Sequence, residues 1–329
     1  MGPRRYDPRR SLLNWKIGNL LTVKKTETGV VNQNWLVGTT RGQYILRRVA
    51  FETSHELRFE LNYLRYLRAH CFPYEIPSPV STFTKQPFVR TNDSISWLYR
   101  RIEGDFKTKL EKKEILQVAK MMAIYHSLVE KSQLDNGKGK GDFFNKKPIL
   151  NELRKFQAEL SRKTVLNTAD RIFLKETAEL LPLLERLRIE GKVSSRLKRY
   201  PLHRDITPDN LVWRNGKLVG LIDFENVGRS NEPLIRDISV FFQHGCRENS
   251  DNLNLDLVRH FLHEYRKYHS LAEAEIKLIP SLIVSGFIED FSYAYWMIRS
   301  DPKRAKLYRL RLYSRLAQSI GKRKLILTL

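Results

Sequence analysis

Residues 200–226 read YPLHRDITPDNLVWRNGKLVGLIDFEN, and they are the most informative part of the chain. Two runs rich in apolar and β-branched residues, LVWRN and LVGLIDF, lie on either side of a turn at Asn215-Gly216. An Asn-Gly pair between such runs is a strong signal for a tight reverse turn. The stretch therefore predicts a loop followed by a β-hairpin.

The loop and the hairpin carry four side chains that can do chemistry: His203, Asp205, Asn210 and Asp223. If the hairpin folds back over the loop, Asn210 and Asp223 can share one metal ion, because amide and carboxylate oxygens are hard ligands that Mg²⁺ accepts. Asp205 then stays off the metal and can accept the proton of a hydroxyl group. We expect His203 to brace the loop by packing and hydrogen bonding.

The same segment resembles the protein-kinase-like superfamily, and specifically its aminoglycoside phosphotransferase and homoserine kinase-like branch. That branch carries HxDxxxxN followed by a DF or DW metal motif, and here HRDITPDN and IDFE stand in those places. The resemblance implies an ATP-dependent phosphotransferase that moves the γ-phosphoryl group to a hydroxyl of a small molecule. In this interpretation Asp205 is the catalytic base, and Asn210 and Asp223 hold Mg²⁺ on the nucleotide phosphates.

The upstream sequence carries the other marks of that family in the expected order. The family has a G..N segment between its first strands, then a cation on a strand, a helix with a glutamate and a hinge that ends in acidic-Gly. Here these are Gly29 with Asn32, then Arg47, then Glu60 and then RRIEG, which ends at Gly104. A helical stretch further on also fits, so the resemblance covers roughly residues 20–297.

The resemblance assigns the nucleotide phosphates to Arg47. Its guanidinium would hold the α and β oxygens, and Glu60 would fix it from the helix. Most kinases have Lys at this position. The planar guanidinium of Arg is better suited to bidentate contacts with phosphate oxygens than the compact ammonium of Lys. Glu56, one helical turn before Glu60, is the rival partner.

Adenine recognition is expected in the same part of the chain. Because side chains alternate along a strand, Ile45 lies on the same face as Arg47 and is expected to line the adenine pocket. In the family the hinge backbone binds adenine, and by position these groups are the Arg100 C=O and the Ile102 N–H.

The order of predicted elements indicates an α+β protein with two lobes. We expect a small antiparallel-sheet N-lobe with one helix over residues 1–102 and a larger, mainly helical C-lobe over residues 103–329, as in the bilobal protein-kinase-like fold. The patterns predict three strands within Leu20–Val49, a helix over Ser54–Arg68, and strands over Ser81–Val89 and Ser94–Arg101. Further helices are predicted over Leu110–Lys131, Ile149–Arg162, Ala169–Glu190, Leu255–Tyr268, Ala272–Arg299 and Arg304–Ile320.

Composition indicates which partners and which cellular compartment to expect for the protein. The 329 residues include 59 Lys and Arg against 36 Asp and Glu, a net charge of +23. Because the excess is spread along the chain, it predicts nonspecific adsorption to polyanions and no specific nucleic-acid partner. Cys71 and Cys246 have no disulfide or zinc spacing, and the chain shows neither a signal peptide nor a membrane span, so we expect a cytoplasmic protein. The sequence holds no signal for an oligomeric state.

Several polar residues outside the loop have structural interpretations. His126, on a helix that faces a core, is expected to be structural. Asp237 stands where the family often has an aspartate that anchors the catalytic loop. Glu289, Tyr293 and Trp296 share one helix face in the region where the family often binds its acceptor, and core packing is the preferred interpretation for them.

Two other functions remain open at this point. A protein kinase would also carry HRD, but Thr207 stands where protein kinases usually have Lys, Glu225 follows Asp223-Phe224 in place of Gly, and no APE-like segment follows. A noncatalytic polyanion-binding protein on a kinase-derived scaffold would use the positive charge. Such a protein would be expected to have lost at least one of Asp205, Asn210 and Asp223, and all three are present. The acceptor stays open among homoserine-like amino alcohols, sugars, choline-like compounds and nucleosides.

Overall fold

The structure is a computed structural model, and it describes residues 6–26, 32–49, 53–91, 94–137, 146–187, 197–247, 253–300 and 306–322. The chain forms two compact units. Unit 1 consists of Met1–Phe106 with Asp209–Ser230, and unit 2 consists of Lys107–Pro208 with Asn231–Leu329. Gly29 lies outside the described residues.

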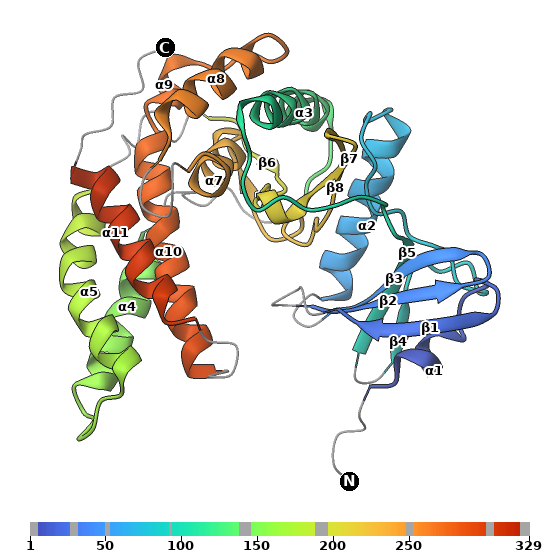
Figure 1. Ribbon diagram of the computed structural model, residues 1–329, viewed down its shortest axis with the longest axis horizontal. Helices are drawn as coiled ribbons and strands as arrows, with labels where there is room; N and C mark the ends of the chain where they lie inside the picture. The colour runs from blue at the N-terminus through green and yellow to red at the C-terminus, as the bar shows by residue number, and fades with distance from the viewer. Residues whose placement is uncertain are drawn as a thin grey trace. The chain divides into compact units, whose positions relative to one another are not determined.

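Unit 1 is built on a five-stranded antiparallel sheet with the strand order β1-β2-β3-β5-β4 (Figure 1). Its strands are β1 (Leu20–Lys25), β2 (Gln33–Thr39), β3 (Gly42–Val49), β4 (Val89–Thr91) and β5 (Ser94–Arg100). The three strands predicted within residues 20–49 and the strand predicted over Ser94–Arg101 are confirmed. In the register of the central strands, Ile45 of β3 stands opposite Leu36 of β2 and Tyr99 of β5.

The strand predicted over Ser81–Val89 is wrong for most of its length. Thr82 closes a turn there, because its C=O accepts a hydrogen bond from Lys85 N–H at 2.9 Å and its hydroxyl accepts one from Gln86 N–H at 3.0 Å. Lys85 adopts a φ of 59°, which does not fit an extended strand. Thr82 forms an isolated bridge with Trp15, and a continuous strand of the sheet begins at Val89.

Two helices accompany the sheet of unit 1. The predicted helix is confirmed as α2 (Ser54–Ala69), which begins with a capping box between Thr53 and Glu56. A short helix, α1 (Pro8–Leu12), was not predicted, although Asp7 as its N-cap and Pro8 at its first position are ordinary start signals. One apolar core joins the end of α1 and the residues after it to the sheet. It consists of Leu12, Trp15, Ile17, Trp35, Val37, Tyr44, Leu46 and Leu98.

The predicted hairpin is present as β7 (Leu211–Arg214) and β8 (Lys217–Leu221). Its turn residues Asn215 and Gly216 both have positive φ, at 52° and 74°, as a tight hairpin turn requires. Trp213 exchanges two backbone hydrogen bonds with Asp105, at 2.8 and 2.9 Å, and Glu75 bonds to Val219 and Leu221 at 2.7 and 3.0 Å.

These bonds tie the hairpin to residues 75–105, which explains why it belongs to unit 1. A division of the chain at residue 102 alone would separate the hairpin from Glu75, although Asp105 would stay on the same side as the hairpin. The lobes 1–102 and 103–329 remain a proposal.

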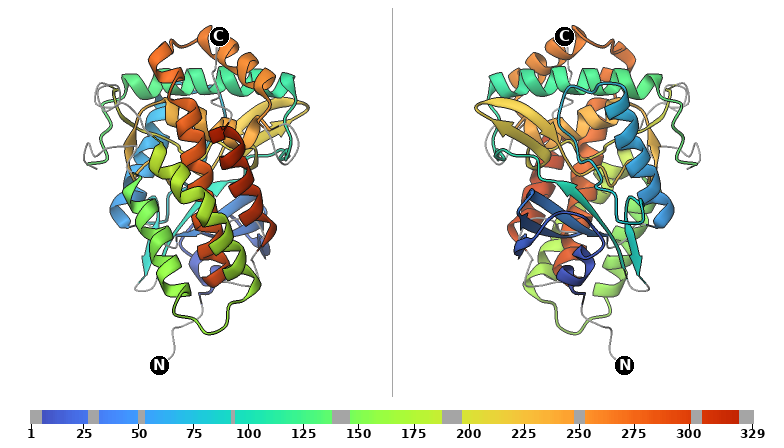
Figure 2. Two further views of the ribbon diagram at one scale, coloured as in Figure 1. Left: turned by 90° about the vertical axis from the view of Figure 1, so that its left-hand side faces the viewer. Right: turned by 90° about the vertical axis from the view of Figure 1, so that its right-hand side faces the viewer.

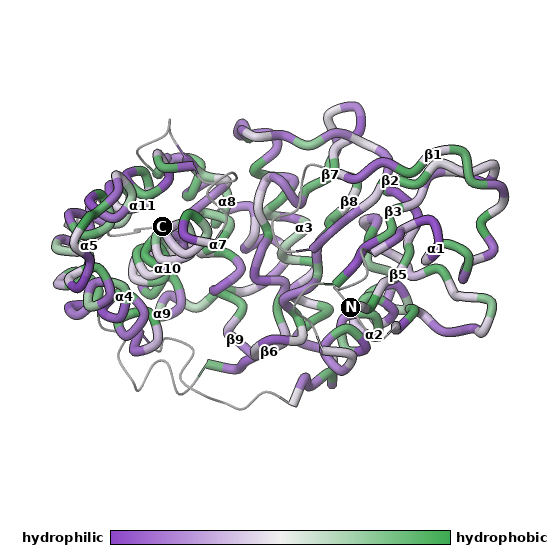
Figure 3. The backbone as a smooth tube through the Cα atoms, turned by 90° about the horizontal axis from the view of Figure 1, so that it is seen from below, coloured by the Kyte–Doolittle hydropathy of each residue, from purple (hydrophilic) through white to green (hydrophobic). Residues whose placement is uncertain are grey.

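Unit 2 is mainly helical (Figures 1 and 2). Its helices are α3 (Lys112–Lys131), α4 (Lys147–Leu160), α5 (Thr168–Arg186), α7 (Ile235–Gly245), α8 (Leu255–Arg266), α9 (Glu273–Ile276), α10 (Ile279–Ser300) and α11 (Tyr308–Lys322), with the short strands β6 (Tyr200–Pro201) and β9 (Asn231–Glu232). Helix α10 packs against α4, α5, α7 and α11, while α3 packs against α8. Hydrophilic and hydrophobic residues alternate along the outer helices α5 and α11 (Figure 3).

The sequence prediction for unit 2 needs two corrections. The single helix predicted over Ala272–Arg299 is two helices, α9 and α10, because Pro280 lacks the N–H that a helix interior needs and stands instead in the first turn of α10. Helix α7 was missed. Nearly all of its residues are buried, so it shows no polar face that a helical period would reveal.

Within the described ranges, no helix has both the length and the apolar character that crossing a membrane requires.

Candidate active site

Arg47 is the centre of a buried charge cluster in unit 1. It lies on β3 and is 4% exposed. Its Nη1 is 3.8 Å from Oε1 of Glu60 on α2, and its Nη2 is 3.0 Å from Oδ1 of Asp223. The predicted pairing with Glu60 is therefore present, whereas Glu56 is engaged in the capping box at the start of α2.

Glu225 is the member of the cluster that the sequence analysis missed. Its Oε2 accepts a hydrogen bond from Arg47 Nη2 at 2.5 Å and another from Asn32 Nδ2. Burial, followed by the neighbouring charge of Asp223, raises the pKa of Glu225, while Arg47 opposes this rise. From the sequence alone, Glu225 is notable only because it stands where a protein kinase has Gly. The signal that could have identified it as a partner of Arg47 is a carboxylate two residues after Asp223.

Asp223 has an unusual backbone. Its φ is 68°, a region that non-glycine residues enter rarely and at some cost in energy. The following residue, Phe224, is fully buried and lies 6.3 Å from the Tyr63 ring of α2, between ring centroids. This packing holds the segment while the Asp223 carboxylate keeps 38% exposure, so the carboxylate remains accessible although it pairs with Arg47.

Asn210 lies beside Asp223 in the backbone of the hairpin. Its C=O accepts a hydrogen bond from Ile222 N–H at 3.0 Å, and the next pair in the ladder is Leu211 with Leu221. Within the described residues, no group of three or more His, Cys, Asp or Glu side chains forms a metal cage. One amide and one carboxylate fit Mg²⁺, which commonly takes one or two protein oxygens and completes its shell with water and substrate phosphates.

The predicted adenine-binding residues occupy neighbouring strands. Ile45 is half-buried on β3, and its Cα partner on β5 is Tyr99. Arg100 ends β5 opposite Tyr44, and Ile102 follows two residues later. The structure thus brings Asn32, Arg47, Glu60 and Asp223 into one cluster. It places Ile45 on the same strand as Arg47, Arg100 at the end of the neighbouring strand β5 and Ile102 just beyond that strand.

Gly104, which ends the predicted hinge, passes very close to the hairpin. Its φ is 149°, and a Cβ on this residue would lie 2.4 Å from the C=O oxygen of Trp213. Only a residue without a side chain fits there. The glycine of the acidic-Gly pattern is therefore required here because the backbone of the hairpin leaves no room for a side chain.

The loop that carries Asp205 belongs to unit 2 and is braced at its backbone. Arg204 N–H donates to Asp237 Oδ1 at 2.6 Å, and Arg204 Nε lies 2.7 Å from Oε1 of Glu232. Arg204 has a φ of 60°, so this second strained residue stands directly before Asp205. Asp205 N–H in turn donates to Nδ1 of His203, which confirms the bracing role expected of that histidine.

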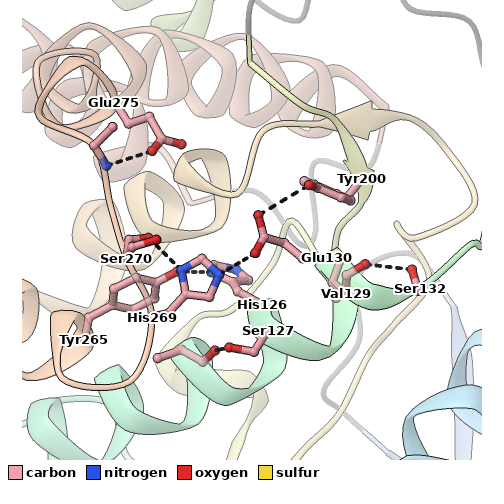
Figure 4. A network of polar contacts seen from close by, with 12 residues as sticks. His126, Ser127, Val129, Glu130, Ser132, Tyr200, Tyr265, His269, Ser270 and Glu275 are labelled. Atoms are coloured by element: carbon pink, nitrogen blue, oxygen red, sulfur yellow. Dashed lines mark hydrogen bonds and ion pairs between the residues drawn. The ribbon is translucent and has the colours of Figure 1, made fainter.

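Asp237 connects the loop to a polar network in unit 2, and Figure 4 shows the part of this network around His126, Tyr265 and His269. Its Oδ2 is 3.4 Å from Nε2 of His126, and Nδ1 of His126 is 2.8 Å from the hydroxyl of Tyr265. The Tyr265 hydroxyl also lies 3.3 Å from Nδ1 of His269, whose Nε2 is 3.0 Å from Oε2 of Glu130. His126 is fully buried, and this burial lowers its pKa. The structural interpretations of His126 and Asp237 agree with these contacts.

The face of α10 that was assigned to core packing is partly exposed. Tyr293 and Trp296 are 45% and 39% exposed, and their rings stack with centroids 5.7 Å apart. Glu289 keeps 42% exposure and forms an ion pair of 2.8 Å with Arg236. The core-packing interpretation is therefore wrong for these three residues, because their part of α10 faces solvent.

Comparison with known proteins places these features in a wider context. The chain is 26% identical to a homoserine kinase of Rhodopseudomonas palustris (strain BisB5), over 82% of this chain and 77% of the relative. It is 27% identical to a homoserine kinase of Rhodospirillum rubrum, over 82% of this chain and 79% of the relative. Both matches span most of either chain.

Two solved structures share the fold. One is the amicoumacin kinase hAmiN in complex with AMP-PNP, Ca²⁺ and Ami, with a TM-score of 0.67, 16% identity and coverage of 97% of this chain and 94% of that one. The other is a microcompartment-associated aminopropanol kinase, with a TM-score of 0.67, 16% identity and coverage of 96% and 95%. At such identity the likeness establishes the fold, and the expected α+β kinase-like fold is confirmed.

The family model of the phosphotransferase enzyme family matches residues 22–273, which is most of the chain and includes Arg47, Glu60, the loop with Asp205 and the hairpin. The enzyme class expected from the sequence, an ATP-dependent small-molecule kinase, is the class of the relatives named above. The chain therefore belongs to the phosphotransferase enzyme family.

Proposed function

We propose that this protein uses ATP and Mg²⁺ to phosphorylate a hydroxyl group of a small molecule, with Asp205 as the catalytic base. The observation that carries the proposal is the position of Arg47. It is buried on β3 between Glu60 and Asp223, so the cation for the phosphates and the carboxylate for the metal lie in direct contact.

In this proposal the residues of unit 1 bind the nucleotide. Arg47 holds the α and β phosphate oxygens and Glu60 orients its guanidinium. The backbone of Arg100 and Ile102 binds the adenine edge, and Ile45 covers the ring. Gly29 and Asn32 are assigned to the loop over the phosphates, and Asn32 is supported by its hydrogen bond to Glu225, the other partner of Arg47.

Asn210 and Asp223 are the proposed ligands of Mg²⁺. The bound ion would neutralise charge on the phosphates during transfer. The support is the fit of their oxygens to a hard cation, the exposure of the Asp223 carboxylate and the backbone bond that fixes Asn210 against the residue before Asp223.

Asp205 then orients the acceptor hydroxyl and takes its proton as the oxygen attacks the γ-phosphorus. The residue has to be held in place for this, because positioning supplies much of the rate enhancement in phosphoryl transfer. The hydrogen bonds that the backbone N–H groups of Asp205 and Arg204 donate to His203 and to Asp237 support such a role.

The acceptor class that we propose to test first is the small amino alcohols. The curated relatives are named homoserine kinases, and one structural neighbour is named an aminopropanol kinase. The family match favours a small molecule over a protein substrate, so the protein kinase alternative is not pursued.

The test is a screen of hydroxyl compounds for stimulated ADP release with Mg²⁺, starting with homoserine and aminopropanol. With the best acceptor, Asp205→Asn should lower kcat by about 10²- to 10⁴-fold, the range that a positioned base contributes. Asp223→Asn should raise the Mg²⁺ concentration needed for half-maximal rate.

Asp209→Asn is the matched control, because it changes a neighbouring exposed aspartate that has no proposed role. The proposal fails if no compound stimulates ADP release, or if Asp205→Asn and Asp209→Asn leave the same activity.

A further inference from the structure

A basic groove lies between α5 and α11 in unit 2. Its volume is about 750 Å³, and its polar lining consists of Arg171, Lys175 and Glu176 from α5 and Tyr308, Arg311 and Arg315 from α11. None of these residues belongs to the proposed active site. The two helices lie side by side (Figure 1).

Two contacts show that α5 and α11 run in the same direction. The Ser314 hydroxyl donates to Oε2 of Glu176 at 2.6 Å, and a Cβ on Gly321 would lie 2.5 Å from Cδ1 of Leu183. Gly321 is about two helical turns after Ser314 on α11, and Leu183 is about two turns after Glu176 on α5, so both helices advance in the same direction. The groove therefore lies by the N-terminal turns of both helices, where the two helix dipoles add positive potential.

The positive charge in the groove is concentrated. Arg171 and Lys175 are four residues apart on α5, and Arg311 and Arg315 are four residues apart on α11, so each pair occupies one helix face. Like charges at this spacing destabilise a helix. Among the described residues, no carboxylate lies within ion-pair distance of Lys175 or Arg311.

The single carboxylate of the groove does little to offset these cations. Glu176 is bonded to Ser314, and Asp170 in the first turn of α5 is 1% exposed and bonded to Lys163 and Tyr295. By contrast, two other arginines of unit 2 are paired with carboxylates, Arg154 with Glu185 and Arg299 with Glu159, each at 2.6 Å. At Lys175 and Arg311 the groove thus presents positive charge that no described carboxylate neutralises.

We propose that this groove binds a single strand of nucleic acid through its phosphates, without reading its sequence. Three of the four cations are arginines, whose planar forks suit phosphate oxygens. Cations stand on both walls of a concavity, which suits a strand lying between them better than a flat membrane. Tyr308, 61% exposed at one end of the groove, offers a ring on which a base can stack.

This inference goes beyond the proposed kinase reaction and does not depend on it. The net charge of +23 alone predicts adsorption of polyanions at many points of the surface. The groove instead predicts that a defined pair of helices supplies a measurable share of the phosphate contacts.

The test uses the full chain and a fluorescein-labelled oligouridylate, with anisotropy measured at about 50 to 200 mM KCl. For single strands, the slope of log K against log salt changes by about 0.7 for each phosphate contact. The double variant Lys175→Gln/Arg311→Gln should therefore make the slope shallower by about 1.4.

The control is Lys112→Gln/Lys131→Gln, which removes two exposed positive charges from α3, away from the groove. It should leave the slope nearly unchanged, and neither double variant should lower the melting temperature of the unmodified protein. Tyr308→Ala should weaken binding by about fivefold or more at every salt concentration without changing the slope, because stacking releases no counterions.

Equal slopes for the two double variants would overturn the proposal, because the contacts would then be spread over the whole surface. It would also be overturned if the groove variant lost binding to inorganic tripolyphosphate or to phosphatidylserine vesicles but still bound the oligonucleotide with unchanged slope.

Discussion

Nη2 of Arg47 lies 3.0 Å from Oδ1 of Asp223, and this ion pair joins the third strand of the sheet to the end of the hairpin. The same guanidinium nitrogen also binds Glu225. The proposed metal ion and the ion pair from Arg47 would draw on the same carboxylate of Asp223. Nucleotide binding and metal binding should therefore be coupled through Arg47.

Replacing Arg47 should damage both stability and nucleotide binding. Arg47→Ala removes a cation from the buried Glu60 and Glu225, although Glu225 keeps Arg229 Nη2 at 3.6 Å from its Oε1, and removing one partner of a buried ion pair costs about 3 to 5 kcal/mol. We expect the free energy of unfolding, measured by urea denaturation, to fall by that amount and ATP affinity, measured by calorimetry, to be lost.

The neighbouring arginine is the control for this change. Arg48 is half-buried, donates to Gln33 and lies over the Tyr6 ring at 4.7 Å, so Arg48→Ala should cost only about 1 kcal/mol and spare ATP binding. Adding Glu225→Gln to Arg47→Ala should restore part of the stability. Equal losses from Arg47→Ala and Arg48→Ala would contradict the role given to the cluster.

Asp237 should act as a positioning residue for the catalytic loop. Asp237→Ala removes the acceptor for Arg204 N–H, so the loop shifts and kcat should fall about 10²-fold, the effect of a misplacement near 1 Å. The KM for ATP should change little, because the proposed nucleotide ligands lie in unit 1. Asp237→Asn keeps a carbonyl oxygen toward Arg204 and should retain most of the activity; a purely structural residue would change both constants together.

Asp290 should make the protein less stable as the pH rises from about 4 to about 6. Burial, opposed by the hydrogen bond from Gln243, raises its pKa from 3.8 to about 6. The folded state then binds the proton more tightly than the unfolded state, so the stability contributed below pH 4 is lost as the pH passes through 6.

The side chain of Asp290 keeps 29% exposure, so we expect an effect on the order of 1 kcal/mol rather than the full value implied by the pKa. Denaturation curves at pH 4, 5, 6 and 7 measure it against Asp290→Asn, which should show a flatter pH profile. Parallel profiles for the two proteins would rule out this assignment.

Gly104→Ala should destabilise unit 1. The new Cβ would meet the Trp213 oxygen at 2.4 Å and occupy a strained φ, with a cost of about 1 to 3 kcal/mol. Gly216→Ala is a matched control, because Gly216 also has positive φ but no atom within 4 Å of its Cβ position. Thermal melts of the two variants separate the steric contact from the backbone strain, and equal shifts would show that the contact is unimportant.

Local signals predicted much of the fold. The Asn215-Gly216 turn, the alternating strands of residues 20–49 and the capped helix from Ser54 all follow from short-range patterns, and the structure has them. The errors occur where tertiary contacts override such patterns. Helix α7 has no solvent face, and the turn at Thr82 replaces a strand because side-chain hydrogen bonds satisfy its backbone.

The candidate site was predicted from spacing, which identifies residues but not their partners. Arg47, Glu60 and Asp223 were named from the sequence, and the structure adds that Arg47 contacts both carboxylates directly and that Glu225 joins Arg47 to Asn32. Charge pairing between residues so distant in the chain leaves no local pattern. For the same reason the groove of α5 and α11 could not be seen, since its two pairs of cations come from separate helices.

The membership of the hairpin in unit 1 has a consequence for how the chain is made. Glu75, Gly104 and Arg47 emerge from the ribosome early, yet their partners Val219, Trp213 and Asp223 are synthesised more than a hundred residues later. Closing such long loops is slow. The nascent sheet must therefore wait, without its hairpin and without Asp223 and Glu225 beside Arg47, until about half of the helical unit has been translated.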